Sequence, residues 1–115
     1  VWEYKTIAQG MSNTIKDFQA IKDAYPDKLV VITEAGWPTL TNGEGIPVEN
    51  VDAMTQKIYY NALSLWAAQE EVLVFLFEAF DEPWKGSQDP TEPEKHWGLM
   101  DVNRKPKLFF KKYYK

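Results

Sequence analysis

Two continuous apolar runs constrain the fold of this 115-residue chain more than any other feature. They are LVVIT, residues 29–33, and VLVFLFEAF, residues 72–80. Neither run alternates between apolar and polar residues, which is typical of strands covered on both faces, as in parallel sheets with helices packed outside. The sequence therefore predicts an α/β fold in which these two runs are buried parallel strands.

Apolar residues at three- and four-residue steps predict helices around these strands. One pattern covers residues 13–25, with Ser12 as the N-cap and Pro26 ending it, and a longer one covers residues 50–70. The tail from Pro106 predicts a last short helix. This order of helices, strands and long loops is typical of parallel α/β architecture, and above all of (β/α)₈ barrels.

The sequence holds too few strands for a complete barrel. Two parallel strands leave exposed edges, and a (β/α)₈ barrel takes about 250 residues. The chain also begins at Val1 in mid-pattern, without Met. We therefore expect residues 1–115 to form one partial barrel, the C-terminal portion of a (β/α)₈ fold. A missing N-terminal part or self-association as a homo-oligomer would complete it.

The residue types argue against several kinds of site. There is no Cys and only one His, His96, so neither a disulfide framework nor a metal cluster is expected, and we predict no cofactor. No apolar run approaches the roughly 20 residues that span a bilayer, so we expect no membrane partner.

The distribution of charge argues against nucleic acid as a partner. The net charge is −4, yet six of the 13 basic residues lie from Asp101 onward, interleaved with apolar residues as on a solvated amphipathic helix. The rest of the chain is acidic and rich in Trp. Such a surface disfavours a phosphate backbone and suits a neutral ligand with many hydroxyl groups, such as a sugar.

A single carboxylate, Glu34, ends the first apolar run. In (β/α)₈ barrels the loops after the strand C-termini build the active site. Gly36 permits a tight backbone, Trp37 offers a flat face for a sugar ring, and Pro38 fixes the turn. A carboxylate beside them can attack or stabilise an anomeric carbon. The alternative is a surface charge or a helix-capping group.

The second run leads into EAFDEPWKG, residues 78–86, which carries further carboxylates. Strand alternation would place Glu78 and Glu82 on one side, so that either could face the same cavity as Glu34. Carboxylates grouped in one site separate their pKa values, and one can stay protonated as an acid. The alternative is that Glu82 merely pairs with Lys85 across a surface turn.

A third stretch, EKHWGLMD, covers residues 94–101. Its His96 and Trp97 suggest a second stacking platform for a sugar. The alternative is a hydrophobic plug beneath the loop.

Three stretches in this order resemble the C-terminal part of glycoside hydrolase family 17, the β-1,3-glucanases and related glucan-remodelling enzymes, particularly its bacterial members. They are VVITEAGWP, FEAFDEPWK and EKHWGLMDVNRKPK. The resemblance implies part of a (β/α)₈ barrel, from the helix before strand seven to helix eight. It also implies a retaining action on β-1,3-glucan and an extracellular or periplasmic location.

The resemblance also assigns roles to residues. It implies that Glu34 is the nucleophile and that Glu82 and Lys85 contact sugar. The expected substrate-binding set is Trp37, Glu82, Trp84, Lys85, Glu94 and Trp97.

One part of the family pattern has no counterpart in this sequence. The family's general acid, a Glu after Asn near the end of strand four, matches no residue here, and Glu78, Glu82 or Glu94 would replace it only in a self-sufficient variant. Three interpretations stay open. The chain is part of a retaining glucan hydrolase or transglycosylase, or a non-catalytic piece that grips β-glucan with Trp37, Trp84 and Trp97, or a self-associating half-barrel without activity.

Overall fold

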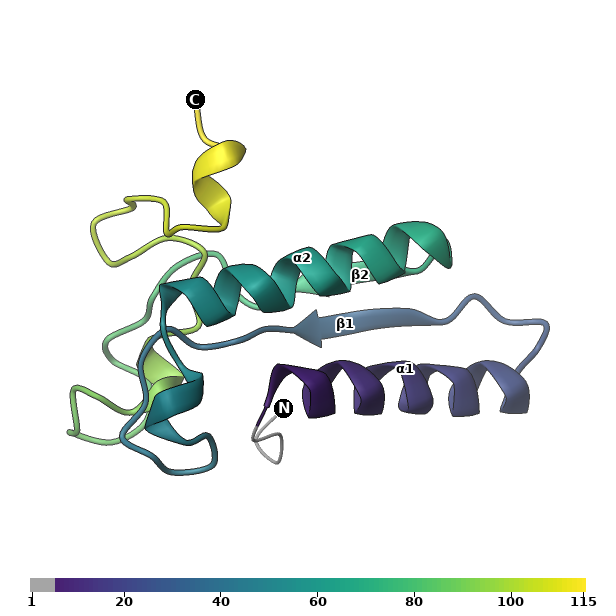
Figure 1. Ribbon diagram of the computed structural model, residues 1–115, viewed down its shortest axis with the longest axis horizontal. Helices are drawn as coiled ribbons and strands as arrows, with labels where there is room; N and C mark the ends of the chain where they lie inside the picture. Colours follow the sequence, from purple (N-terminus) through teal and green to yellow (C-terminus); the bar gives the residue numbers. More distant parts are fainter. Residues whose placement is uncertain (1–5) are drawn as a thin grey trace.

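The computed structural model describes residues 6–115 and places two helices alongside a parallel pair of strands (Figure 1). The elements are helix α1 (Ile7–Ala24), strand β1 (Val31–Ala35), helix α2 (Ala53–Gln69) and strand β2 (Leu73–Leu76). Short 3₁₀ helices, Val48–Asn50, Pro93–Lys95 and Phe110–Lys112, interrupt the loops and the tail. The predicted α/β class with parallel strands is confirmed.

The sheet contains a bulge close to the C-terminal end of β1. Ile32 lies opposite Val74, but the next registered pair joins Ala35 to Leu76. β1 therefore advances three residues where β2 advances two, which is the definition of a bulge. Ala35 is buried in the core and Ile32 packs against it, whereas both residues between them, including Glu34, are exposed.

The core lies where α2 packs on the strands and on the loops that follow them. Its buried apolar side chains come from β1, α2, three loop segments and the tail: Ala35, Trp37, Ile46, Val51, Tyr59, Tyr60, Leu63, Trp97 and Phe109. α1 packs against α2 through the rings of Phe18 and Trp66, whose centroids lie 5.5 Å apart. Figure 1 shows the loops after both strands gathered beyond the arrowhead of β1.

α1 begins earlier than the sequence pattern predicted. Thr6, not Ser12, is the N-cap: its hydroxyl accepts a hydrogen bond from the Gln9 amide at 3.2 Å, and the Gln9 side chain accepts one from the Thr6 amide at 3.1 Å. This capping box satisfies two amides of the first turn, so the helix extends over residues without the apolar pattern. The predicted end before Pro26 is confirmed.

The strands are shorter than predicted or shifted along the sequence. β1 covers Val31–Ala35 instead of 29–33, and β2 ends at Leu76 instead of residue 80. A cis peptide bond joins Phe77 to Glu78 just beyond β2. After it the backbone pairs with residues 97–100, so strand alternation does not set the directions of the later carboxylates.

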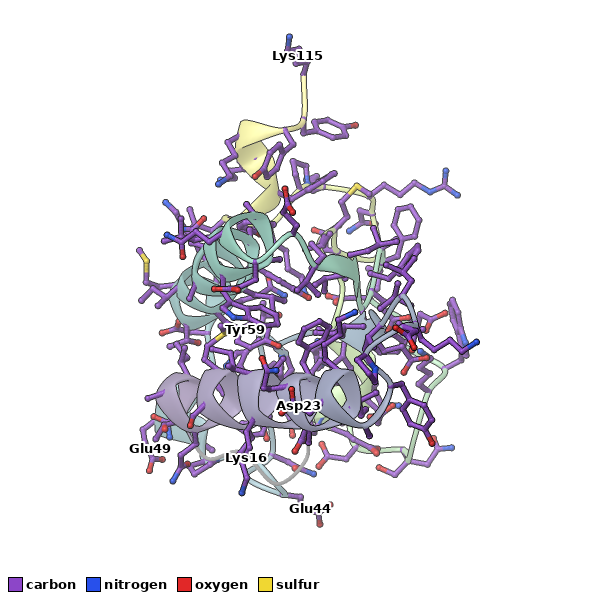
Figure 2. The ribbon with its side chains drawn as sticks, turned by 90° about the vertical axis from the view of Figure 1, so that its right-hand side faces the viewer. Lys16, Asp23, Glu44, Glu49, Tyr59 and Lys115 are labelled. Carbon is purple, nitrogen blue, oxygen red and sulfur yellow. The ribbon has the colours of Figure 1, made fainter. Side chains whose placement is uncertain are left out.

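The tail does not form the expected helix eight. The backbone of Lys105 and Lys107 pairs instead with Asp101 and Leu99, which keeps this part of the tail extended. Only the 3₁₀ turn Phe110–Lys112 follows, and Lys115 ends the chain away from the body of the molecule (Figure 2). Within residues 6–115, no helix is long and apolar enough to cross a membrane.

One side of the sheet is open. Val74 and Leu76 pack against the core, whereas Leu73 and Phe75 are 51% and 54% exposed. The expectation that both faces of each strand are covered is therefore wrong for this chain. The helices α1 and α2 cover only part of the strand surface.

Candidate active site

Glu34 is exposed one residue before β1 ends, and it borders a hollow of about 300 Å³ between β1 and α1 that Phe18 and Ile32 also line. The bulge gives it this position, because two consecutive residues of β1 point away from the core before Ala35 returns to it. The end of β1 touches the segment after β2: the Phe77 amide donates to the Ala35 carbonyl at 2.8 Å. Glu34 thus stands beside the stretch that carries the other candidate residues.

Glu78, Glu82 and Lys85 form one cluster just beyond β2. The Lys85 ammonium donates to both carboxylate oxygens of Glu78, at 3.1 and 3.0 Å, and also pairs with Glu82. It further lies 4.7 Å from the centroid of the Phe77 ring. The alternative interpretation, a simple surface pair between Glu82 and Lys85, therefore describes only part of the cluster, because Glu78 binds the same ammonium.

The two carboxyl groups of the cluster have opposite pKa shifts. Burial, followed by a hydrogen bond with Glu82, raises the pKa of Glu78 to about 7, although Lys85 opposes the shift. The hydrogen bonds from Glu78 and Lys85 lower the pKa of Glu82. Burial lowers the pKa of Lys85, but its bonds to both carboxylates outweigh burial and raise it. The predicted separation of carboxyl pKa values thus occurs between Glu78 and Glu82.

The backbone holds the three predicted motif stretches together. The Glu78 amide donates to the Trp97 carbonyl at 3.2 Å, and the Thr39 amide donates to the His96 carbonyl at 3.0 Å. The buried Gln56 side chain of α2 donates to the carbonyls of both Trp37 and Gly98, at 3.0 and 3.1 Å. The loop after β1, the segment after β2 and residues 96–98 therefore form one connected unit.

Sequence reasoning missed the residue that shapes the loop around Trp84. Lys95 is buried, and its ammonium contacts the carbonyls of Pro83, Lys85 and Ser87. A buried lysine that satisfies three carbonyls fixes the path of the backbone between them. Its only signal in the sequence was its place in a stretch rich in Pro and Gly.

Sequence reasoning also missed a buried ion pair between the tail and this loop. The Lys107 ammonium lies 2.6 Å from the Asp81 carboxylate and 2.8 Å from the Thr39 hydroxyl. The same Asp81 oxygen accepts from the Gly98 amide at 2.9 Å. Burial lowers the pKa of Lys107, although Asp81 opposes that shift. Part of the basic tail is therefore a structural clamp and not a solvated helix face.

Two of the three expected sugar platforms lie inside the protein. Trp37 is 0% exposed, its indole N–H donates to the Asn50 carbonyl at 3.0 Å, and its ring packs against Tyr59. Trp97 is 3% exposed and packs edge-on against Phe77. A buried ring offers no face to a sugar, so the stacking role expected of both is corrected to a packing role. For Trp97 this is the hydrophobic plug considered as the alternative.

Trp84 is the expected platform that does reach the surface. It is 73% exposed and borders two hollows of about 380 and 310 Å³. The first is lined by Lys95 and His96, and the second by Phe80, Glu82 and Arg104. A flat apolar ring beside hollows that combine apolar and charged side chains has the character of a sugar-binding surface.

Glu94 and His96 lie in the segment that follows this loop. Glu94 is half-buried in the 3₁₀ helix Pro93–Lys95. The His96 ring is within hydrogen-bond distance of the Pro90 carbonyl, 2.7 Å from Nε2, and its Nδ1 lies 3.9 Å from Asp81. In the part of the chain that the structure describes, no three His, Asp or Glu side chains gather as a metal site.

Comparison with known proteins decides the family. The model of the BtgE/BtgC glycoside hydrolase domain matches residues 1–98. The chain belongs to the BtgE/BtgC glycoside hydrolase domain family. This confirms the glycoside hydrolase class that the sequence predicted.

Individual relatives agree with this family. A glucan 1,3-beta-glucosidase from Arthroderma benhamiae is 31% identical, with 93% of this chain and 38% of the relative covered. An endo-laminarinase from Formosa Hel1_33_131 is similar in structure, with a TM-score of 0.78, 28% identity and coverage of 93% of this chain and 29% of that one. The chain therefore spans less than half the length of these proteins.

A third relative carries the family name expected from the sequence. The glycoside hydrolase family 17 beta-1,3-glucanosyltransferase from Rhizomucor miehei has a TM-score of 0.77 and 25% identity, with 94% of this chain and 38% of that one covered. The resemblance to family 17 is thereby confirmed. Its bacterial leaning finds no support in the relatives from Arthroderma and Rhizomucor, which are fungi.

Proposed function

We propose that this chain is the C-terminal portion of a (β/α)₈-barrel enzyme that cleaves β-1,3-glucan with retention of anomeric configuration. The described residues would supply strands seven and eight, the helix between them and the helix before them. Family membership and the printed activities of the relatives support this proposal. The parallel pairing of β1 and β2 fits neighbouring strands of such a barrel.

In this proposal Glu34 is the nucleophile. Its carboxylate attacks the anomeric carbon, and the bond from that carbon to the leaving oxygen breaks as a general acid from the rest of the barrel protonates that oxygen. Water or a sugar hydroxyl then releases the covalently bound glycosyl group. The observation that carries this role is the bulge, which exposes Glu34 at the C-terminal end of β1, where barrel enzymes hold their catalytic groups.

The loop beyond β2 supplies the sugar contacts in this proposal. Glu82 and Lys85 offer charged hydrogen-bonding groups, Trp84 offers an exposed ring, and Glu94 lies further along the same segment. An extracellular or periplasmic location is part of the proposal, as the resemblance to family 17 implies. Self-association or the missing part of the barrel would cover the open side of the sheet.

Trapping the glycosyl-enzyme intermediate tests the role of Glu34. The enzyme that contains this chain within a complete barrel would be reacted with a 2-fluoro glucosyl-β-1,3-glucoside, and its peptides examined by mass spectrometry. We expect the label on Glu34, and a loss of laminarin turnover by a factor of about 10⁴ or more in Glu34→Gln, since the nucleophile is removed. Glu49→Gln, at the edge of the molecule (Figure 2), is the matched control. Label on another residue would refute the role.

A second candidate function, glucan binding without cleavage, has support from the exposed Trp84. The burial of Trp37 and Trp97 weakens the interpretation in which three rings grip the polymer. Retention of this chain on insoluble β-1,3-glucan tests a binding role that depends on Trp84 alone. Binding that is lost in Trp84→Ala and kept in Glu34→Gln would favour this function, provided that the complete enzyme shows no turnover.

A further inference from the structure

The cluster beyond β2 places two carboxyl groups around one ammonium. Both oxygens of Glu78 lie within 3.1 Å of the Lys85 nitrogen, and Glu82 pairs with that nitrogen as well. The Glu78 side chain is only 15% exposed. Two ionised carboxylates with a single cation in a partly buried site would leave one uncompensated negative charge, which burial disfavours.

A shared proton removes that excess charge. The carboxyl groups of Glu78 and Glu82 converge on the single Lys85 ammonium, and two carboxyl groups held this close can form a hydrogen bond with each other only when one of them holds a proton. With Glu78 neutral, the remaining charges of Glu82 and Lys85 cancel. Two hydrogen bonds fix the backbone of Glu78: its amide donates to the Trp97 carbonyl, and its carbonyl accepts from the Leu99 amide. The Glu78 side chain therefore extends from a fixed point of the backbone.

We propose that Glu78 is a positioning residue of the sugar site: its protonated carboxyl group donates a hydrogen bond to Glu82 and so holds Glu82 and Lys85 in the arrangement that binds sugar. This inference rests on the proposed function, in which Glu82 and Lys85 contact the substrate. Loss of the proton turns the hydrogen bond into a repulsion between two carboxylates, and the arrangement loosens.

The other charged groups near Glu78 do not supply this proton. Tyr60 of α2 lies behind the same segment, with its hydroxyl donating to the Phe77 carbonyl at 2.9 Å, and burial raises its pKa well above the ordinary value. Lys107 from the tail acts on Glu78 through space but is paired with Asp81. Burial and the bond to Glu82 raise the pKa of Glu78 to about 7, so its proton is lost near neutral pH.

Direct titration of this chain provides the first test and needs no activity. The side-chain carboxyl carbons of ¹³C-labelled glutamates would be followed by NMR from pH 3 to 9, with the Glu78 signal assigned by its absence in Glu78→Gln. We expect a midpoint near 7 for Glu78 and a midpoint below the ordinary glutamate value for Glu82. A Glu78 midpoint near the ordinary value of 4.5 would overturn the proposal.

The pH dependence of KM in the complete barrel enzyme provides the second test. For laminari-oligosaccharides we expect KM to rise about fivefold to tenfold between pH 6 and 8 as Glu78 loses its proton, with a smaller change in kcat, because a charge-assisted contact to the substrate weakens. Glu78→Gln should abolish this rise, since its amide N–H donates to Glu82 at every pH. Glu78→Ala should raise KM throughout the range.

Controls separate this role from others. Glu49→Gln should keep the wild-type rise in KM between pH 6 and 8. His96→Gln should keep it as well, which would exclude the imidazole as the source of the pH dependence. The proposal fails if Glu78→Gln keeps the wild-type rise in KM. If Glu34→Gln leaves turnover intact while NMR still finds the shared proton, the proposed nucleophile is refuted and the carboxyl pair is not.

Discussion

At the scale of single residues, the candidate active site depends on buried polar groups. Asp81 and Lys107 are both largely buried, and together they join the loop after β2 to the tail. Breaking a buried ion pair by removing one partner leaves an uncompensated charge, whereas removing both partners costs much less. The pair therefore makes the position of the site loop depend on a residue near the end of the chain.

Lys107→Met tests this dependence. We expect the free energy of unfolding in urea to fall by about 3–5 kcal/mol, because the Asp81 carboxylate loses its buried partner. The double variant Lys107→Met with Asp81→Asn should recover part of that loss, since the remaining amide is neutral and its oxygen still accepts from Gly98. Exposed Lys16→Met, on α1 (Figure 2), serves as the control. Equal stability of Lys107→Met and wild type would contradict the assignment.

The raised pKa of Glu78 predicts a stability that falls as the pH rises. Between its ordinary value of 4.5 and about 7, the folded chain holds the Glu78 proton more strongly than the unfolded chain does. By linkage, stabilisation present below pH 4.5 is lost through this window, on the order of 2 kcal/mol. The stabilisation from the lowered pKa of Glu82 is complete above 4.5, so it does not offset the loss.

Urea unfolding at pH 5 and pH 8 measures this effect. The wild type should be less stable at pH 8, whereas Glu78→Gln should show a much smaller difference between the two pH values. Glu49→Gln should behave as wild type. A wild-type stability that increases from pH 5 to pH 8 would contradict the shift.

At the scale of elements, hydrophobic periodicity predicted the strands and helices, whereas features that arise from tertiary contacts were missed. The apolar runs indicated both strands, although β1 lies two residues further along and β2 ends four residues earlier than predicted, and α2 was predicted to within three residues. The roles of Glu34, Glu82 and Lys85 stay predictions. The bulge that exposes Glu34 has no local signal, because it arises from the register between two strands. Likewise, nothing near Trp37 in the sequence shows that its ring packs on Tyr59 instead of facing solvent.

Gly36 lies where these tertiary contacts are closest. A Cβ built on Gly36 would come within 1.9 Å of the Phe77 carbonyl oxygen, which also accepts from Tyr60. Gly36→Ala must therefore push the end of β1 away from the segment that carries Glu78. We expect a loss of about 1–3 kcal/mol or more in unfolding free energy, and weaker amide protection from exchange around Phe77.

Gly43 provides the contrast for this variant. It has a φ of +92°, and a Cβ there would meet nothing closer than 3.8 Å. Gly43→Asn should cost less than about 1 kcal/mol, because Asn enters the left-handed region more easily than most residues. If both variants lost the same stability, close packing at Gly36 would not be the cause.

At the scale of the whole molecule, the chain has a core on one side of its sheet and an open surface on the other. Leu73 and Phe75 of β2 are more than half exposed, and the exposed Glu34 belongs to the neighbouring strand. In the proposed barrel this side faces the interior, which the preceding strands would close. Without them, apolar side chains and unpaired strand edges meet water, a condition that favours association of like chains.

The isolated chain should therefore self-associate through the sheet. Sedimentation velocity over a range of concentrations should show species larger than the 13.4 kDa monomer. Phe75→Thr should shift the distribution toward monomer, because it removes an exposed ring while keeping a residue that favours strands. Leu65→Gln removes an apolar side chain of similar exposure from α2 and should leave association unchanged. A wild-type chain that stays monomeric at every concentration would show that the open sheet is stable in water, and an equal effect of both variants would place the contact elsewhere.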